Sequence, residues 1–569
     1  MTENLEKVRV AMTGSSTLEL MEQKLAESLA GRGLEGELYF SGYGQYRQEI
    51  LDALSGLYEF APDFIFLVID AEEVLGEILA SPLELDRDQS RELARARAGE
   101  VLELCQKAIE GAAGARLFVS NLAASAAAMG TLEGNSPFSV KTAIRAFNDR
   151  LEEGAEALSG IFVLDWEGLA LKHGLDTVFD PRLWYLARTR QGRAGQQFLA
   201  DLMARTISAS KNPMHKCLVL DLDNTLWGGV IGEEGLGGIT LGDNGPGLAF
   251  QEFQRGIQNL RRRGIVLAIS SKNNMEDVME VLEKHPDMIL RIDDFAVIAA
   301  DWRDKGTHLK EIAETLDLGL DSFVFMDDNP AERELVRQTC PQVHVVEMPA
   351  DPSRYGQTLN GLELFDSYSL TDEDLRRGEM YGETAKRRKS MSQAPSLEEF
   401  HRSLEMTAAI EKDNQIEVAR IAQLTQKTNQ FNLTTRRYTE PEILGFMESG
   451  RHHVYSLRLG DRFGDSGLVG IGILEEKGNA WHLDNFLMSC RVIGRDAEGL
   501  LIWKIAEDAR KSAMAEITGE FLPTKKNKIA ESFFADHDFA PVPASATGWN
   551  LDISKTGLAP PQWINLLEN

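Results

Sequence analysis

The sequence predicts a multidomain protein of the mixed α/β class. Apolar strand-like segments alternate with amphipathic helical segments twice along the chain, and a third region combines successive strands with helices. At 569 residues, the chain has room for about three to four domains of ordinary size. Hydrophobic residues make up 43% and charged residues 26%, which is typical of folded proteins and not of disordered ones.

The first predicted domain covers residues 1–210. Its expected strands are KVRVAM, GELYFSG, PDFIFLVID and ARLFVSNL, and a long helix is expected from about 85 to 112. A last helix is expected near 195–208. Strands and helices that alternate in this way form a parallel sheet covered by helices on both faces.

The second predicted domain, residues 214–362, begins sharply at KCLVLDLDNTLWGG and repeats the α/β alternation. Its expected strands and helices are Cys217–Leu222, Leu248–Arg263, Ile265–Ser270, Lys305–Leu316 and Ser322–Met326. Residues 363–400 form a predicted helical linker, because the segment 366–400 is rich in charged residues, Ser and Met.

The third predicted domain, residues 401–569, has an α+β pattern. Helices are expected at 415–427 and 440–447, before the strands VYSLRL, LVGIGILE and AWHLDNFLMS. The helix EGLLIWKIAEDARK and the strand AEITGEFL follow. Meandering strands followed by a helix and a further strand distinguish this domain from the first two.

The overall charge and the cysteine content exclude several classes of protein. The net charge of −29 argues against a partner of duplex nucleic acid, which needs a basic footprint. The N-terminal MTENLEKVRVAM is no signal peptide, and no run of 18 apolar residues predicts a membrane span. Four cysteines, at 105, 217, 340 and 490, form no CxxC pair, so we expect free thiols in a reducing cytoplasm.

Two carboxylates, Asp221 and Asp223, follow the apolar run LVL in the second domain. Both project from the carboxyl-terminal end of the predicted strand, where open α/β sheets place their sites. One carboxylate can attack phosphorus while the other moves a proton. Asn224 and Thr225 continue the motif.

Three further polar clusters follow later strands of the same domain. Ser271, Lys272 and Asn273 end the strand LAIS, and their hydroxyl and amide groups suit a phosphoryl oxygen. Lys305 begins a helix and would place a cation beside developing charge. Asp327 and Asp328 end the strand FVFM and offer the hard oxygen ligands that Mg²⁺ prefers.

These four clusters, in this order, resemble the motifs of the haloacid dehalogenase superfamily of phosphatases and phosphotransferases. The resemblance implies a Rossmann-like domain with Asp221 as nucleophile and Asp223 as general acid/base, Asp328 being the alternative acid. It also implies that Asn224, Thr225, Ser271, Lys272, Asn273 and Lys305 bind the phosphate. Mg²⁺ would be held by Asp221, Asp327, Asp328 and the main-chain carbonyl of Asp223.

The segment between the first two motifs predicts a minimal cap. Nine of the 27 residues from Asn224 to Phe250 are Gly, which favours a flap of turns over a helical cap domain. The strings DLDNTLWGGVIGEEG and FVFMDDNPAERELVR resemble the FkbH-like branch of this superfamily. An open site suits a substrate that a large partner carries.

Cys490 is the second candidate for chemistry. It ends a predicted strand one turn before a helix, and the cationic residues Arg491 and Arg495, which are candidates for binding substrate or phosphate, follow it. A helix N-terminus and nearby cations both favour the nucleophilic thiolate. From the residues alone, an inert packing cysteine remains the alternative. Cys217, within a strand, and Cys340, before Pro341, are interpreted as packing residues.

KTNQFNLTTRRY, MSCRVIGR and FLPTKKN resemble the acyltransferase-like domain of FkbH-type proteins, whose fold is similar to GNAT acetyltransferases. The resemblance implies that Cys490 carries a glyceryl thioester before transfer to an acyl carrier protein. Arg491 and Gly494 fit the GNAT pyrophosphate loop, but Asp496 would repel a pyrophosphate, so a carrier-borne phosphopantetheine arm fits better than acetyl-CoA.

No base for Cys490 is evident in the sequence. His482 and Asp484 have the right strand parity, but six to eight strand residues put them about 20 Å or more away. A basic rim that attracts an acidic carrier protein is one interpretation of a set of nearby cations, and ordinary solvated charge is the other. These cations are Lys427, Arg436, Arg437, Lys525, Lys526 and Lys528.

Gly14-Ser15-Ser16-Thr17, after the first strand, resembles the nucleophile block of SGNH hydrolases. That family has Gly-Asp-Ser, so Ser15 replaces the Asp, and no Asp-x-x-His occurs near the end of the domain. FDPRLWY occupies that region, and His173 is wrongly spaced from Asp176 and Asp180. We therefore expect an SGNH-like domain that is not catalytic.

The resemblance implies a bifunctional glyceryltransferase/phosphatase. It would take 1,3-bisphosphoglycerate, a phosphorylated three-carbon metabolite, and load a glyceryl group through Cys490 onto an acyl carrier protein for polyketide-type biosynthesis. The alternative is a Mg²⁺-dependent phosphatase whose C-terminal domain only docks a partner. A carrier-binding scaffold with a weakened site is the third hypothesis.

Overall fold

The computed structural model describes residues 5–112, 114–123, 132, 140–211, 214–368, 375, 378, 380–383, 386–387, 390–391, 394–524, 526–543 and 545–567. At Lys427 and Cys490 it describes the backbone only. Chain contacts divide the protein into two compact units, Met1–Met214 with Asp366–Ser369, and His215–Phe365 with Leu370–Asn569. Within the predicted 363–400 linker, 15 of the 38 residues lie outside the described part of the chain.

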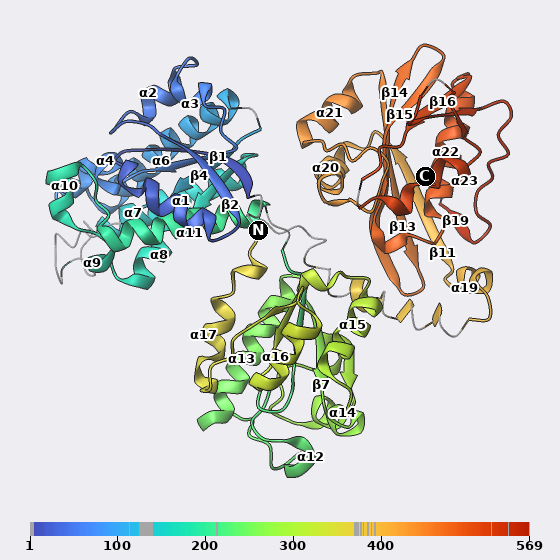
Figure 1. Cartoon of the computed structure of the whole chain (residues 1–569). Helices are drawn as coiled ribbons and strands as arrows, with labels where there is room; N and C mark the ends of the chain where they lie inside the picture. The colour runs from blue at the N-terminus through green and yellow to red at the C-terminus, as the bar shows by residue number, and fades with distance from the viewer. Residues whose placement is uncertain are drawn as a thin grey trace. The chain divides into compact units, whose positions relative to one another are not determined.

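The first unit, drawn in blue to teal in Figure 1, is built on a parallel sheet of order β2-β1-β3-β4-β5. Apolar side chains alternate between its faces: Ala11 packs with α2, α6 and α7, whereas Val10 and Met12 pack with α1, α8 and α11. Its strands are β1 (Glu6–Gly14), β2 (Leu34–Phe40), β3 (Phe64–Val68), β4 (Arg116–Ser120) and β5 (Ile161–Leu164).

The helices of this unit cover both faces, as the sequence predicts. A Cβ on Gly14 would lie 2.3 Å from the Val68 carbonyl oxygen, so only glycine allows β1 to end this close to β3. The helices are α1 (Glu22–Ala30), α2 (Tyr46–Leu51), α3 (Gly56–Glu59), α4 (Ala71–Val74), α5 (Gly76–Ala80), α6 (Arg87–Gly111), α7 (Val140–Glu156), α8 (Trp166–His173), α9 (Leu175–Val178), α10 (Pro181–Ala187) and α11 (Arg193–Lys211).

The second unit contains a five-stranded parallel sheet of order β10-β9-β6-β7-β8. The strands are β6 (Cys217–Leu220), β7 (Val266–Ser271), β8 (Phe295–Ala300), β9 (Phe323–Met326) and β10 (His344–Val345). The helices are α12 (Ile231–Glu234), α13 (Gly245–Arg262), α14 (Met275–Lys284), α15 (Lys305–Leu316), α16 (Pro330–Thr339) and α17 (Tyr355–Asn360). One face of the sheet packs against α15 and α16.

The second unit also contains a mixed sheet of order β17-β18-β16-β15-β14-β13-β11-β19, with β12 paired to β15. It is mainly antiparallel, but β15 and β16 run parallel, as do β11 and β19. The strands are β11 (Met406–Lys412), β12 (Phe431–Asn432), β13 (His452–Asp461), β14 (Gly464–Lys477), β15 (Ala480–Met488), β16 (Glu516–Glu520), β17 (Ala540–Pro541), β18 (Gly548–Asp552) and β19 (Ile564–Leu566).

Helices cover both faces of this mixed sheet. α22 and α23 pack with side chains such as Tyr455 and Trp481, whereas α20 and α21 pack with Val454 and Ile471 on the opposite face. The helices are α19 (Leu397–Ser403), α20 (Val418–Lys427), α21 (Glu440–Glu448), α22 (Ala497–Lys511) and α23 (Phe533–Asp536). The predicted class, a multidomain α/β protein with an α+β region, is confirmed.

Candidate functional site

Three carboxylates meet at the carboxyl-terminal end of the β10-β9-β6-β7-β8 sheet. Asp221 follows β6, and Asp327 and Asp328 follow β9. These strands are parallel neighbours, so their last residues and those that follow lie side by side. Ligand oxygens of all three carboxylates lie within 4.8 Å of one another. The structure thus brings together two clusters that are about a hundred residues apart in the sequence.

Lys305 neutralises part of this charge. The side chain is 2% exposed, and its Nζ donates to Asp221 Oδ1 at 2.5 Å and to the Ser270 carbonyl at 2.6 Å. Nζ also lies 3.2 Å from Asp327 Oδ2. Burial alone lowers the pKa of Lys305, but attraction to Asp221 and Asp327 outweighs burial, so the pKa is raised. One ammonium faces three carboxylates, which leaves excess negative charge.

The three carboxylates fit a divalent cation. Asp327 is fully buried; its Oδ1 accepts from the Asn329 amide at 2.8 Å, while its Oδ2 makes no hydrogen bond and only faces Lys305. Burial and repulsion from Asp221 raise the pKa of Asp327 to about 6, and the same two effects raise that of Asp328. A buried carboxylate oxygen that shares the Lys305 ammonium with Asp221, in a cluster of excess negative charge, suits a hard cation such as Mg²⁺.

Asp223 is held apart from the acidic cluster. Its Oδ1 accepts from Trp227 Nε1 at 2.9 Å and from the Ile231 amide at 3.1 Å, and its Oδ2 accepts from Asn273 Nδ2 at 2.9 Å. Asn273 Nδ2 also donates to Ser271 Oγ at 3.1 Å. The carboxylate of Asp223 is therefore engaged with donors, which leaves its main-chain carbonyl as the group for a metal.

The other predicted phosphate-binding residues differ in their surroundings. Thr225 is buried and its Oγ1 accepts from the Asp328 amide at 3.2 Å, so it links the two acidic loops. Asn224 has a φ of 56° and accepts through Oδ1 from the Gly229 amide at 2.9 Å, which fixes the turn after β6. Lys272 donates to Glu332 Oε1 at 2.6 Å. The structure therefore pairs Lys272 with α16 and does not bring it to the acidic cluster.

The Gly-rich segment forms a small flap, as predicted. Residues 224–250, all of which the structure describes, contain only the four-residue helix α12 before α13 begins. An isolated bridge pairs Gly228 with Thr240 and closes the flap on itself. The prediction of a minimal cap is confirmed.

His308 is a site residue that the sequence interpretation missed. It is fully buried, with Nδ1 3.2 Å from Ser270 Oγ and Nε2 2.8 Å from Asp301 Oδ1. The same Ser270 accepts from Lys305 through its carbonyl, so His308 holds the end of β7 against the start of α15. The available signal was its place three residues after Lys305, on the same face of one helix.

Cys490 begins the short 3₁₀ turn η8 (Cys490–Val492), between β15 and α22. Its side chain lies outside the described part of the chain. Arg491 donates through Nε to Ser489 Oγ at 3.1 Å. Arg495 is 7% exposed and donates to Asp461 Oδ2 at 3.0 Å, and burial lowers its pKa to about 10. Arg495 is thus paired inside the domain and does not present an open phosphate site.

The other three cysteines are buried free thiols, which confirms that Cys217 and Cys340 are packing residues. Burial raises the pKa of Cys217 and raises that of Cys105 to about 12, so neither forms a thiolate readily. Cys340 Sγ lies 3.6 Å from the Gly306 carbonyl oxygen.

Four of the groups considered as a base or a basic rim for Cys490 have partners of their own. His482 Nδ1 lies 3.0 Å from Thr518 Oγ1. Asp484 accepts from Tyr438 and pairs with Arg436. Arg437 donates to Asn429 Oδ1 at 3.2 Å, whereas Lys526 and Lys528 are exposed. The side chain of Lys427 and all of Lys525 lie outside the described residues.

The predicted N-terminal serine motif is buried. Ser15 Oγ donates to Asp70 Oδ2 at 2.9 Å and accepts from the Asp70 amide at 2.8 Å. Burial raises the pKa of Asp70 to about 6. His173 stacks on Phe198, with ring centroids 3.8 Å apart. Among the described residues of this unit, no histidine is hydrogen-bonded to Ser15 or Ser16, in agreement with an incomplete triad.

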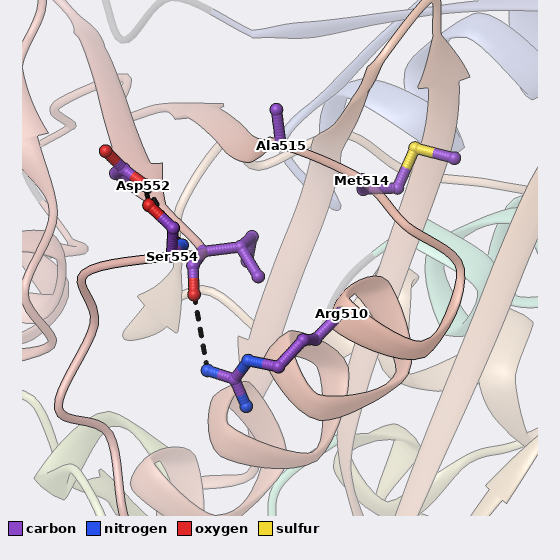
Figure 2. A pocket seen from close by; sticks show the side chains of 6 residues that line it. Arg510, Met514, Ala515, Asp552 and Ser554 are labelled. Atoms are coloured by element: carbon purple, nitrogen blue, oxygen red, sulfur yellow. Dashed lines mark hydrogen bonds between the residues drawn. The ribbon is translucent and has the colours of Figure 1, made fainter.

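A pocket of about 430 Å³ lies in the C-terminal region (Figure 2). Its charged side chains are already paired: Arg510 with Glu507 and the Ile553 carbonyl, and Asp552 with Lys555. This pocket therefore offers no charged group that is ready for a ligand. Among the described residues, no helix is both long and apolar enough to cross a bilayer.

Comparisons with known proteins relate the chain to one group in particular. Residues 9–194 match the family described as "FkbH, N-terminal domain". The crystal structure of the N-terminal part of the protein BF1531 from Bacteroides fragilis, which contains a phosphatase domain complexed with Mg, is 31% identical. The match covers 64% of this chain and 96% of that one, with a TM-score of 0.58.

Two other likenesses are weaker. The lipase Lip_vut3 from goat rumen metagenome is 16% identical over 35% of this chain and 95% of that one, with a TM-score of 0.27. The ribosomal-protein-S18-alanine N-acetyltransferase from Escherichia coli is 13% identical over 26% of this chain and 96% of that one, with a TM-score of 0.20. No curated protein sequence matches the chain.

Proposed function

The chain belongs to the FkbH-like family of haloacid dehalogenase proteins, and from this premise we propose that the β6–β10 sheet carries a Mg²⁺-dependent phosphatase site. The observation that carries the proposal is the buried cluster of Asp221, Asp327 and Asp328 beside Lys305. A relative with 31% identity contains a phosphatase domain complexed with Mg.

In the proposed reaction, an oxygen of Asp221 attacks phosphorus and the bond from phosphorus to the leaving oxygen breaks. Protonated Asp223 gives its proton to that oxygen. Asp223 then takes a proton from water, which attacks the aspartyl phosphate, releases phosphate and restores Asp221. The three donors around Asp223 hold its carboxylate in place for this second step.

Other groups hold the phosphate during both steps. Lys305 and Ser271 would bind phosphoryl oxygens, with Lys305 released in part from Asp221 and Asp327. Mg²⁺, bound by Asp221, Asp327, Asp328 and the Asp223 carbonyl, would reduce the repulsion between carboxylate and phosphate. His308 and Asp301 would hold Ser270 and Lys305 in position.

We propose further that this phosphatase is coupled to glyceryl transfer. The Cys490 thiolate would attack the acyl carbon of 1,3-bisphosphoglycerate and release the acyl phosphate as phosphate, which leaves a phosphoglyceryl thioester. The Asp221 site would remove the second phosphate. The glyceryl group would then pass by thioester exchange to the phosphopantetheine thiol of an acyl carrier protein. Support comes from the position of Cys490 before α22 and from the family membership.

A Mg²⁺-dependent phosphatase with a docking C-terminal domain is the second candidate. One observation favours it: Arg495, a candidate for binding substrate or phosphate, is buried against Asp461. His482 and Asp484 are engaged with other residues and do not serve as a base for Cys490.

Phosphate release is expected to require Mg²⁺, and the affinity of the site for Mg²⁺ is expected to fall as the pH falls through about 6. Asp327 has a pKa raised to about 6, so protons compete with the metal for this ligand below that pH. In the metal-free protein, the contribution of Asp327 to the free energy of unfolding has the opposite pH dependence. Because the folded pKa lies above the unfolded value of 3.8, the stabilising effect of protonating Asp327 is full below the unfolded value and is lost as the pH rises through about 6.

Two measurements check this expectation. Release of phosphate from 3-phosphoglycerate should stop in EDTA, return with added Mg²⁺, and need more Mg²⁺ at pH 5.5 than at pH 7.5. Thermal melts should show a larger rise of Tm on addition of Mg²⁺ at pH 7.5 than at pH 5.5. Phosphate release that is indifferent to EDTA would contradict the proposed metal site.

A further inference from the structure

Two exposed apolar side chains stand out in the phosphatase sheet and its helices. Among residues 215–365, all of which the structure describes, Met275 and Trp302 are the large hydrophobic residues that remain exposed, at 41% and 71%. Large apolar side chains at the surface are informative when they gather beside a site, because water contact is unfavourable for them.

Strand register places both residues beside the phosphate-binding loop. Ala300, the last residue of β8, is the partner of Ser271 at the end of β7. Trp302 follows Ala300 by two residues and precedes Lys305 by three, and Met275 follows Asn273 by two. Trp302 Nε1 donates to Asn274 Oδ1 at 3.2 Å, which ties the indole to the start of α14. Trp302 and Met275 together are called the apolar lip.

A hollow of about 270 Å³ lies beside Met275 of the apolar lip, and Asp301 and Arg303, the neighbours of Trp302 in the sequence, also line it. Met275 lines it together with side chains of the edge strand β8 and of α15. Its apolar lining consists of Met275, Val297, Ile298, Ala299, Ala300 and Ile312, and polar surface is supplied by Asp301, Arg303, Glu311 and Thr315. The volume is slightly below that of pockets that enclose a whole small ligand, about 300 Å³ or more, so it suits one segment of a ligand.

The charged groups at the hollow already have partners. Arg303 pairs with Asp301 at 2.7 Å and also with Glu311. Asp301 in addition contacts the buried His308. Two carboxylates share one guanidinium, so the hollow has no free cation and disfavours an anionic segment, while its apolar side chains suit an uncharged one.

We propose that the apolar lip and the hollow bind an extended, uncharged, apolar chain that continues from the phosphorylated group of the substrate. This inference rests on the proposed phosphatase function of the same site and narrows its substrate class. The substrate is a phosphate ester that carries such a chain, and the chain belongs either to a free ester or to an arm tethered to a protein. Burial of the chain on Trp302 favours binding because the indole gives a large contact area and loses little rotamer freedom.

Monoalkyl phosphates of increasing length test the inference. For the wild-type protein, kcat/KM is expected to rise from ethyl to butyl to hexyl phosphate, by about twofold per half-buried methylene. Trp302→Ala should lower kcat/KM for hexyl phosphate about tenfold and for ethyl phosphate about twofold or less. Thr315→Leu places a larger side chain of α15 in the hollow, and it should lower kcat/KM more for hexyl phosphate than for the shorter esters. Ile416→Ala removes another exposed apolar residue, 94% exposed, and serves as the matched control.

Conservative variants separate the apolar contact from the hydrogen bond. Trp302→Phe keeps the apolar surface and should retain most of the preference for hexyl phosphate. Asn274→Ala removes only the acceptor of the indole N–H and should have a small effect. A wild-type rate that is independent of chain length, or an equal loss for all esters in Trp302→Ala, overturns the inference. No phosphate release from any ester would instead overturn the proposed phosphatase function.

A second comparison identifies the source of the chain. A 3-phosphoglyceryl thioester is offered on an acyl carrier protein and, separately, on N-acetylcysteamine. If Trp302→Ala lowers kcat/KM for the carrier-bound thioester as much as for hexyl phosphate, the chain is a tethered arm. A loss for hexyl phosphate alone identifies a free ester. Either result supports the apolar lip as the determinant of specificity.

Discussion

Replacement of Asp221 by Asn is expected to lower the rate of phosphate release by about 10⁴-fold or more, the usual loss for a covalent nucleophile. The amide cannot attack phosphorus, and the change removes one of the three negative charges of the metal cluster. It adds no bulk, and the repulsion that Asp221 exerts on Asp327 disappears, so the fold should persist. Initial rates with saturating Mg²⁺ and 3-phosphoglycerate measure the effect.

Asp293→Asn is a suitable control for this variant. Asp293 lies in the 3₁₀ turn η3 (Ile292–Asp294) of the same sheet domain and is exposed. The control should keep wild-type activity, and both variants should melt cooperatively. Near wild-type activity in Asp221→Asn would place the nucleophile elsewhere.

Cys490→Ala is expected to abolish covalent loading by 1,3-bisphosphoglycerate, while Asp221→Asn should load an adduct heavier than the wild-type adduct by one phosphate. Without the thiol, no thioester forms; without Asp221, the second phosphate stays on the glyceryl group. Intact-mass analysis after incubation distinguishes these products.

Cys340→Ala is the control for this experiment because Cys340 is buried, and it should load as the wild type does. An adduct that persists in Cys490→Ala would overturn the assignment of the acyl carrier residue. An adduct on Asp221→Asn that has already lost the second phosphate would show that another group removes it. No adduct on Asp221→Asn would mean that dephosphorylation comes first or that Asp221 also serves in acylation.

The acidic cluster could be anticipated from the sequence because its members follow buried strands. Short runs of apolar residues mark β6 and β9, and parallel strands present their carboxyl-terminal ends at one edge of a sheet. Once the strands were recognised, the proximity of Asp221 and Asp327 followed from topology alone. The same reasoning located Lys305, which begins α15 as predicted.

The ion pairs between side chains could not be predicted from the sequence in the same way. Lys272 lies next to Ser271 in the sequence, yet it pairs with Glu332, which is 60 residues away. Arg495, which precedes α22, meets Asp461 at the end of β13 and is buried. Such pairs depend on how distant elements pack together, and the local sequence around each residue does not indicate that packing.

Several strands also escaped prediction. β5 is only four residues long, and β8 is an edge strand with the sequence FAVIAA, whose partly exposed residues do not alternate in polarity. β11 has the pattern MTAAIEK, in which alanines weaken the apolar signal. The omission of β8 had a consequence, because this strand leads to Trp302 and lines the hollow beside the phosphate site.

Capture of the phosphorylated aspartate tests the central claim most directly. Asp223→Asn should slow the attack of water more than the first step, so that phosphate accumulates on the protein. Peptide mapping after acid quench is expected to find one phosphate on Asp221 in the presence of Mg²⁺ and none in EDTA. Phosphate on another residue, or steady release of phosphate by the wild type with no labelled Asp221 in the variant, would contradict the account.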